Sequence, residues 1–123
     1  MKKDINNFDD LEAWQKAHEL ALDIYNITSG FPKEELFGLT RQLRRAASSV
    51  SANIAEGFAR FHYKDKARFY YQARGSNAEV QSFLLLSRDL HFITSEECSG
   101  LFGKANETRK LINGLIKSIN RQL

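Results

Sequence analysis

The 123-residue sequence has few of the residues that build crosslinked or extended architectures. It contains one proline and one cysteine. A single cysteine excludes an internal disulfide framework and a CxxC zinc site. Its longest unbroken apolar stretch, residues 83–86, is far shorter than the ~18 residues that cross a membrane. The first residues also lack the apolar run of a secretion signal. We therefore expect a cytoplasmic protein in a reducing compartment.

Neither sign of charge dominates the sequence. Eighteen basic residues against fifteen acidic ones give a net charge of +3, which excludes an acidic tail protein and a histone-like polycation. The length and the 42% of hydrophobic residues are typical of one globular domain. We expect a single domain over residues 1–123.

Apolar residues recur at steps of three and four along most of the chain, which indicates helices rather than strands. The first helix is expected to begin near Asn7 and to end at Gly30 and Pro32. Because His18 lies on the apolar stripe of this helix, we expect it in the core or in an interface. The apolar stripe consists of Leu11, Trp14, His18, Ala21 and Tyr25.

The second helix is expected to open at Pro32, with the carboxylates of Glu34 and Glu35 near its positive end. Small residues let a neighbouring backbone approach, so we expect close packing contacts at Gly57 and, in the third helix, at Gly75. The seam of the second helix consists of Leu36, Leu39, Leu43, Ala46, Val50, Asn53 and Gly57.

The third helix is expected to run from residues 63–65 to about Leu90, with apolar side chains on more than one face. Such a helix is either central in its bundle or shared with another subunit. The pattern Thr94-x-x-Glu97 predicts a capping box at the start of a fourth helix. Four long helices joined by short turns predict an all-α, antiparallel, up-down-up-down four-helix bundle.

Three segments carry a family resemblance: LEAWQKAHELALDIY at 11–25, FPKEELFGLTRQLRRAASSVSANIAEGFAR at 31–60 and ARGSNAEVQSFLLLSRDL at 73–90. They resemble the bacterial intervening-sequence proteins, which are encoded within insertions in 23S ribosomal RNA genes and are sometimes labelled S23. The resemblance implies a left-handed four-helix bundle that assembles as a homopentameric ring. A related branch, the accessory variability proteins of diversity-generating retroelements, works with a reverse transcriptase and nucleic acid. No biochemical function is established for the family, so the resemblance predicts the fold and not an activity.

Positive charge is concentrated in the middle of the chain. Residues 33–75 contain nine basic and four acidic side chains, whereas residues 1–32 contain three basic and six acidic ones. Basic residues interleaved with aromatic ones suit phosphate contact with base stacking, and a ring would repeat the surface in each subunit. The candidate nucleic-acid-binding residues are Arg41, Arg44, Arg45, Arg60, Lys64, Lys66 and Arg68.

Several of these arginines also have a structural interpretation. Arg44 and Arg45 flank the seam of the second helix, where arginine forms salt bridges between helices or subunits. Arg74 has the same two interpretations. Both remain open from the sequence, and the acidic residues available as partners are Glu35, Glu56 and Glu79.

Polar residues also lie close to the apolar stripes of the second and third helices. They form either a polar pocket or a hydrogen-bonded network that fixes helix register and oligomer number, and we favour the network. The residues assigned to this group are Asn53, Glu56, Arg74, Asn77 and Glu79.

No sequence motif supports catalysis. The histidines have no metal-ligand spacing, and the Glu-x-x-His pairs of di-iron bundles do not occur. Cys98 lies on the seam of the fourth helix, where cysteine behaves as a small hydrophobic residue. Glu56 and Glu79 have no nucleophile or metal beside them. We therefore expect no enzymatic activity, no cofactor and no metal.

Two functional hypotheses follow. The first is a non-enzymatic homo-oligomer, pentameric by resemblance, that binds structured RNA or DNA through its second and third helices, alongside a partner protein. It would capture phosphates with little base readout. The alternative is a protein-interaction scaffold with no direct nucleic-acid binding.

Overall fold

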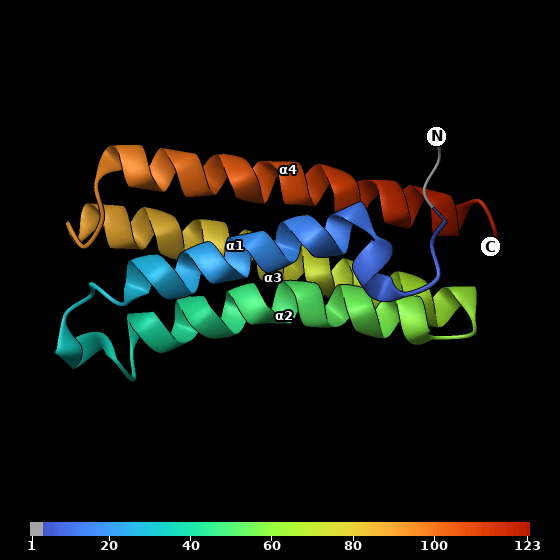
Figure 1. Cartoon of the computed structure of the whole chain (residues 1–123), viewed down its shortest axis with the longest axis horizontal. Helices are drawn as coiled ribbons and strands as arrows, with labels where there is room; N and C mark the ends of the chain where they lie inside the picture. Colours follow the sequence, from blue (N-terminus) through green and yellow to red (C-terminus); the bar gives the residue numbers. More distant parts are fainter. Residues whose placement is uncertain (1–3) are drawn as a thin grey trace.

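The computed structural model describes residues 4–123, which contain four long helices and no strand. These are α1 (Glu12–Thr28), α2 (Leu39–Ala59), α3 (Tyr63–Asp89) and α4 (Ser95–Asn120). Short 3₁₀ turns, η1 (Phe8–Asp10) and η2 (Lys33–Glu35), precede α1 and α2. Successive helices run in opposite directions along one long axis (Figure 1). The predicted all-α, antiparallel four-helix bundle is confirmed.

Each helix packs against two neighbours: α1 and α3 each contact both α2 and α4. The fully buried aliphatic side chains come from all four helices, and each stabilises the fold by roughly 1.5–3 kcal/mol relative to an exposed position. Because α3 has only two neighbours, it is not central, and its Leu86 and Leu90 remain exposed. The largest of the buried aliphatic side chains are Leu20, Ile24, Leu43, Ile54, Leu84 and Ile112.

The start and the register of α1 differ from the prediction. Asn7 and Asp10 form a capping box, but it opens the 3₁₀ turn η1, and the extended backbone of Leu11 separates that turn from α1. The buried face of α1 includes Ala13, Ala17, Leu20 and Ile24. His18, expected in the core or in an interface, does not lie in the core of this chain: it is exposed and stacks on Trp14, with 4.6 Å between the ring centroids.

Helix α2 begins seven residues later than its predicted start at Pro32. The two carboxylates after Pro32 belong to η2, and the Glu35 carboxylate lies 3.5 Å from the Leu39 backbone nitrogen. Glu35 therefore caps α2 from the preceding turn, without being part of the helix. Leu36, predicted to start the buried seam, is consequently exposed.

Helices α3 and α4 begin where the sequence predicts. Thr94 Oγ1 accepts a hydrogen bond from the Glu97 backbone nitrogen at 3.0 Å. The Glu97 carboxylate accepts one from the Thr94 nitrogen at 2.8 Å. This is the predicted capping box. Cys98 follows it and is buried, with its sulfur 3.6 Å from the Leu84 carbonyl oxygen, and burial raises the pKa of its thiol.

The two glycines predicted to mark close contacts behave differently. A Cβ on Gly57 would lie 2.7 Å from Cε1 of Tyr70 and 3.2 Å from the Lys66 carbonyl oxygen. The prediction for Gly57 is therefore confirmed. A Cβ on Gly75 would meet nothing within 4 Å, so the prediction for Gly75 is wrong. Gly75 lies on the outer surface of α3, where no neighbouring element approaches it.

Candidate nucleic-acid interface

The turn between α2 and α3 carries the most exposed aromatic side chain of residues 4–123. Arg60 ends α2 in an extended conformation, and α3 resumes at Tyr63 after a connection of three residues. Phe61 in this connection is 89% exposed, and its ring meets that of His62 edge-on. Tyr63 is also exposed. Such a short connection holds these rings at the end of the bundle where the basic residues also lie.

Arg60 and Arg68 flank one half-buried ring beside this turn. Their guanidinium carbons lie 4.7 and 4.9 Å from the centroid of Phe69. Arg60 approaches Glu56 to 3.4 Å, and Arg68 approaches Asp65 to 4.0 Å. Exposed pairs of this kind contribute less than about 1 kcal/mol and are screened by salt. Phe69 thus positions two exposed guanidinium groups that a polyanion could still reach.

Lys66 has a structural role in this turn. Its ammonium donates to the backbone oxygens of Phe58 at 2.7 Å and of Gly57 at 3.3 Å. These are carbonyl groups of the last turn of α2, which have no partner within the helix. Partial burial lowers the pKa of Lys66. The structure therefore places Lys66 across the α2–α3 junction, and Lys64 outward on the surface.

Arg44 and Arg74 also make contacts within the chain. Arg44 donates to Thr28 Oγ1 at 2.8 Å and to the Tyr25 carbonyl oxygen at 3.3 Å, which joins α2 to the end of α1. Its guanidinium also lies over the Tyr25 ring. Arg74 donates to Asn113 Oδ1 at 3.0 Å, which joins α3 to α4. Neither arginine pairs with the glutamates considered as partners.

Arg41 and Arg45 are exposed on α2 and form no ion pair within residues 4–123. Arg45 lies fifteen residues before Arg60 on the same helix, which corresponds to ~22 Å at 1.5 Å per residue. The candidate residues that remain exposed therefore form two groups. One is Arg41 and Arg45 on α2. The other, which we call the turn cluster, consists of Arg60, Lys64 and Arg68.

The polar residues of α2 and α3 form two separate sets of hydrogen bonds. Asn53 Nδ2 donates to the Ser49 carbonyl and hydroxyl oxygens, and the Ser49 hydroxyl lies 3.0 Å from that of Ser76 on α3. Buried Asn77 donates to the Ala105 carbonyl oxygen of α4 at 2.8 Å. The Ser49–Ser76 contact joins α2 to α3 and the Asn77 bond joins α3 to α4, whereas Asn53 itself bonds only within α2.

Glu56 and Glu79 lie apart. Ser49 and Ser76 are level with each other, and the two glutamates lie seven and three residues from them in opposite directions along the axis. Their separation along the bundle is therefore ~15 Å. Glu56 pairs with Arg60, and Glu79 is exposed. Glu56 and Glu79 therefore do not form a pair for acid and base chemistry.

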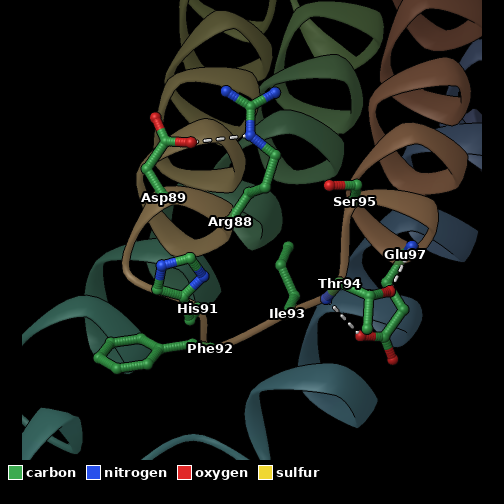
Figure 2. Close-up of a pocket in the computed structure, with 8 residues that line it drawn as sticks. All are labelled: Arg88, Asp89, His91, Phe92, Ile93, Thr94, Ser95 and Glu97. Atoms are coloured by element: carbon green, nitrogen blue, oxygen red, sulfur yellow. Dashed lines mark hydrogen bonds and ion pairs between the residues drawn. The ribbon is translucent and has the colours of Figure 1, made fainter.

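A hollow at the opposite end of the bundle, where α3 connects to α4, is lined in part by polar side chains that bond to each other (Figure 2). Arg88 Nε donates to Asp89 at 2.9 Å, and Glu97 is held in the capping box. His91 has a left-handed backbone with φ of 64°. Across residues 4–123 no three His, Cys, Asp or Glu side chains are grouped closely enough to hold a metal ion.

The structure adds basic residues that sequence reasoning missed. Lys117 and Arg121, in the last turns of α4, lie beside Tyr71 and Arg74 of α3. They are more than forty residues away in the sequence, so only the packing of α3 against α4 brings them together. Their spacing of four on one helix face is a signal, but a weak one.

Comparison with protein families gives a clear match. The sequence pattern of the 23S rRNA-intervening sequence proteins matches residues 9–114. The chain belongs to this family. A search of curated proteins finds no match. Within residues 4–123 no helix has the length and apolar character that crossing a membrane requires.

A solved structure supports the fold of this intervening-sequence protein. A crystal structure of a protein with unknown function from the S23 ribosomal protein family of Bacteroides thetaiotaomicron VPI-5482 matches with a TM-score of 0.77. The two sequences are 24% identical, and the match covers 85% of this chain and 98% of the other. At this identity the similarity shows the fold alone.

Proposed function

We propose that this intervening-sequence protein is a non-enzymatic homo-oligomer that binds structured RNA or DNA through the surface formed by α2 and α3. By resemblance the oligomer is a pentamer, and we infer that it acts in the cytoplasm beside a partner protein. The binding is electrostatic capture of phosphates, with little readout of bases.

The turn cluster is the observation that carries this proposal. Arg60, Lys64 and Arg68 are exposed at the end of the bundle where α2 connects to α3, and Phe61 in that connection is 89% exposed. Their only ion pairs within residues 4–123 are exposed contacts with Glu56 and Asp65, which a phosphate can replace at little cost. In an oligomer the cluster would be repeated, and linked sites bind a polyanion with avidity.

The contacts of the other basic residues reduce the set of residues that we assign to phosphate binding. Arg44, Lys66 and Arg74 are held by hydrogen bonds to other helices or to helix ends. We therefore assign phosphate contact to Arg60, Lys64 and Arg68, with Arg41 and Arg45 as a second group on the outer face of α2.

Fluorescence anisotropy with a structured RNA hairpin, titrated at several salt concentrations, tests the proposal. Light scattering should first establish the assembled mass of the protein. We expect affinity to fall steeply with salt. The variant Lys64→Glu/Arg68→Glu should bind more weakly, with a salt slope reduced by roughly 1.5, because two phosphate contacts are lost. Lys33→Glu, which alters an exposed lysine of η2, is the matched control and should bind normally.

The alternative function, a protein-interaction scaffold, is favoured by exposed apolar side chains at the other end of the bundle. Phe37 is 79% exposed, and Leu36 beside it is also exposed. If the wild-type protein shows no RNA or DNA binding at low salt, where electrostatic attraction is strongest, the scaffold function replaces the first proposal.

A further inference from the structure

A shallow groove runs between the first half of α3 and the last turns of α4. Two adjoining hollows form it, and both are lined by Tyr71 and Asn120. The groove begins at Lys64 and Arg68, which belong to the turn cluster, so the two surfaces are continuous. Its polar and charged walls are Lys64, Arg68, Gln72 and Arg74 from α3 and Asn113, Lys117, Asn120 and Arg121 from α4.

Every charged residue that lines the groove is basic. Five basic side chains and no acidic side chain occur among the lining residues. Lys64, Lys117 and Arg121 form no ion pair within residues 4–123, and Arg68 has only the exposed contact with Asp65. A groove with charge of one sign on both walls concentrates the electrostatic field and attracts a chain of opposite charge.

An aromatic ring lies between these cations. The side chain of Tyr71 is 44% exposed. The Arg74 guanidinium carbon lies 5.0 Å from the ring centroid, and Asn120 Nδ2 donates to the Tyr71 hydroxyl at 3.4 Å. These contacts orient the ring while a large part of it stays open to solvent. An exposed ring beside basic residues provides a stacking surface for a nucleic-acid base.

Amide side chains complete the groove. Gln72, Asn113 and Asn120 offer hydrogen-bond donors and acceptors next to Tyr71. Such groups suit the edges of bases and the 2′-hydroxyl groups of RNA. Bases in a duplex are paired and stacked on each other, so only an unpaired strand presents free base faces to the ring.

We infer that this groove binds an unpaired strand of nucleic acid, with phosphates at Lys64, Lys117 and Arg121 and a base stacked on Tyr71. The inference rests on the proposed function and specifies its ligand: the single-stranded parts of a structured RNA. It also extends the binding surface from α2 and α3 onto α4.

The test compares a fluorescent single-stranded RNA 12-mer with the same strand annealed to its complement, by anisotropy on the assembled protein. The single strand should bind more tightly than the duplex. Tyr71→Ala should weaken single-strand binding at least fivefold, because stacking is lost. Tyr71→Phe keeps the ring and should bind as the wild type does. Circular dichroism melting verifies that each variant is folded.

Charge reversal on α4 provides a second readout. Lys117→Glu should lower the salt slope for the single strand by about 0.7, the value of one phosphate contact. Lys33→Glu at the other end of the bundle makes the same change in net charge and should leave the slope unchanged.

The outcomes separate this inference from the proposed function. Equal affinity for strand and duplex, with Tyr71→Ala and Lys117→Glu both binding normally, overturns the groove and leaves phosphate capture at the turn cluster in place. Absence of binding to either RNA by the wild type overturns both. Preference for the single strand that Tyr71→Ala removes and Tyr71→Phe retains supports the groove.

Discussion

The hollows at the two ends of the bundle differ in the charge of their lining, and connections of different length close the two ends. At one end a connection of three residues joins α2 to α3, and the groove beside it is lined by five basic residues. At the other end ten residues join α1 to α2. The hollow between α1 and α4 there is lined by three carboxylates and Lys104, which is bonded to Asp23.

The contacts at the two ends distinguish basic residues that are bonded within the chain from basic residues that stay exposed. Lys104 is neutralised by Asp23, and the hydrogen bond raises the pKa of the lysine. Lys66 at the other end is occupied by backbone oxygens of α2. Lys64, two residues earlier, has no such partner. Total charge therefore says little about binding, because neighbouring lysines on one helix have different roles.

The largest expected effect comes from adding a side-chain carbon at the close contact between α2 and α3. Gly57→Ala places a Cβ 2.7 Å from the buried ring of Tyr70 and 3.2 Å from the backbone oxygen of Lys66. Overpacking of this kind costs about 1–3 kcal/mol. Urea denaturation should show a corresponding loss of stability.

Gly75→Ala is the matched control, since it makes the same change in a helix where nothing lies within 4 Å. It should increase stability by about 0.5–1 kcal/mol through helix propensity. Equal effects at the two glycines would contradict the close contact between α2 and α3.

A smaller effect is expected when the structural lysine loses its charge. Lys66→Met keeps an apolar stem but removes the hydrogen bonds to Gly57 and Phe58, and should lower stability by about 1 kcal/mol. Lys64→Met should change stability by less than about 0.5 kcal/mol.

Binding should show the reverse order. Lys64→Met should weaken RNA binding and lower the salt slope, whereas Lys66→Met should leave both close to wild type once folding is verified. The distinction between the two lysines fails if Lys66→Met lowers the salt slope as much as Lys64→Met.

A dependence of stability on alkaline pH is also expected at the same junction. Burial raises the pKa of Tyr70 to about 12, from an ordinary value of 10.0. The unfolded chain then loses this proton at a lower pH than the folded protein. The stabilisation is complete below pH 10 and declines as the pH rises towards 12.

The comparison of wild type with Tyr70→Phe isolates this effect, because the lowered pKa of Lys66 acts in the opposite direction and is common to both proteins. Between pH 9 and 11 the wild type should lose more stability in urea denaturation than Tyr70→Phe. Parallel declines would show that Tyr70 is not buried at the α2–α3 junction.

The sequence predicted the architecture because its strongest signals are local. The Thr94-x-x-Glu97 pattern located the start of α4, and apolar spacing identified four helices and no strand. The start of α2 was misplaced because the carboxylate of Glu35 reaches Leu39 from a preceding turn. That arrangement has the same sequence signature as a carboxylate inside the first turn.

The candidate surface was harder to predict, because it depends on where long side chains end. Composition identified Arg44, Lys66 and Lys64 alike, and only the packed helices show that the first two bind oxygens of their own chain. Lys117 and Arg121 join the surface through the contact of α3 with α4. The spacing of four between these two residues is only a weak sign of that contact.

The burial of Cys98 makes the molecule's only thiol a probe of local opening. Its sulfur is buried beside the Leu84 carbonyl oxygen of α3, so a thiol reagent should label it slowly in the native protein. The rate of labelling therefore reports local opening at the start of α4. A cysteine introduced at the exposed Phe61 would react at once. Protection of that cysteine by a ligand would report binding at the α2–α3 connection separately.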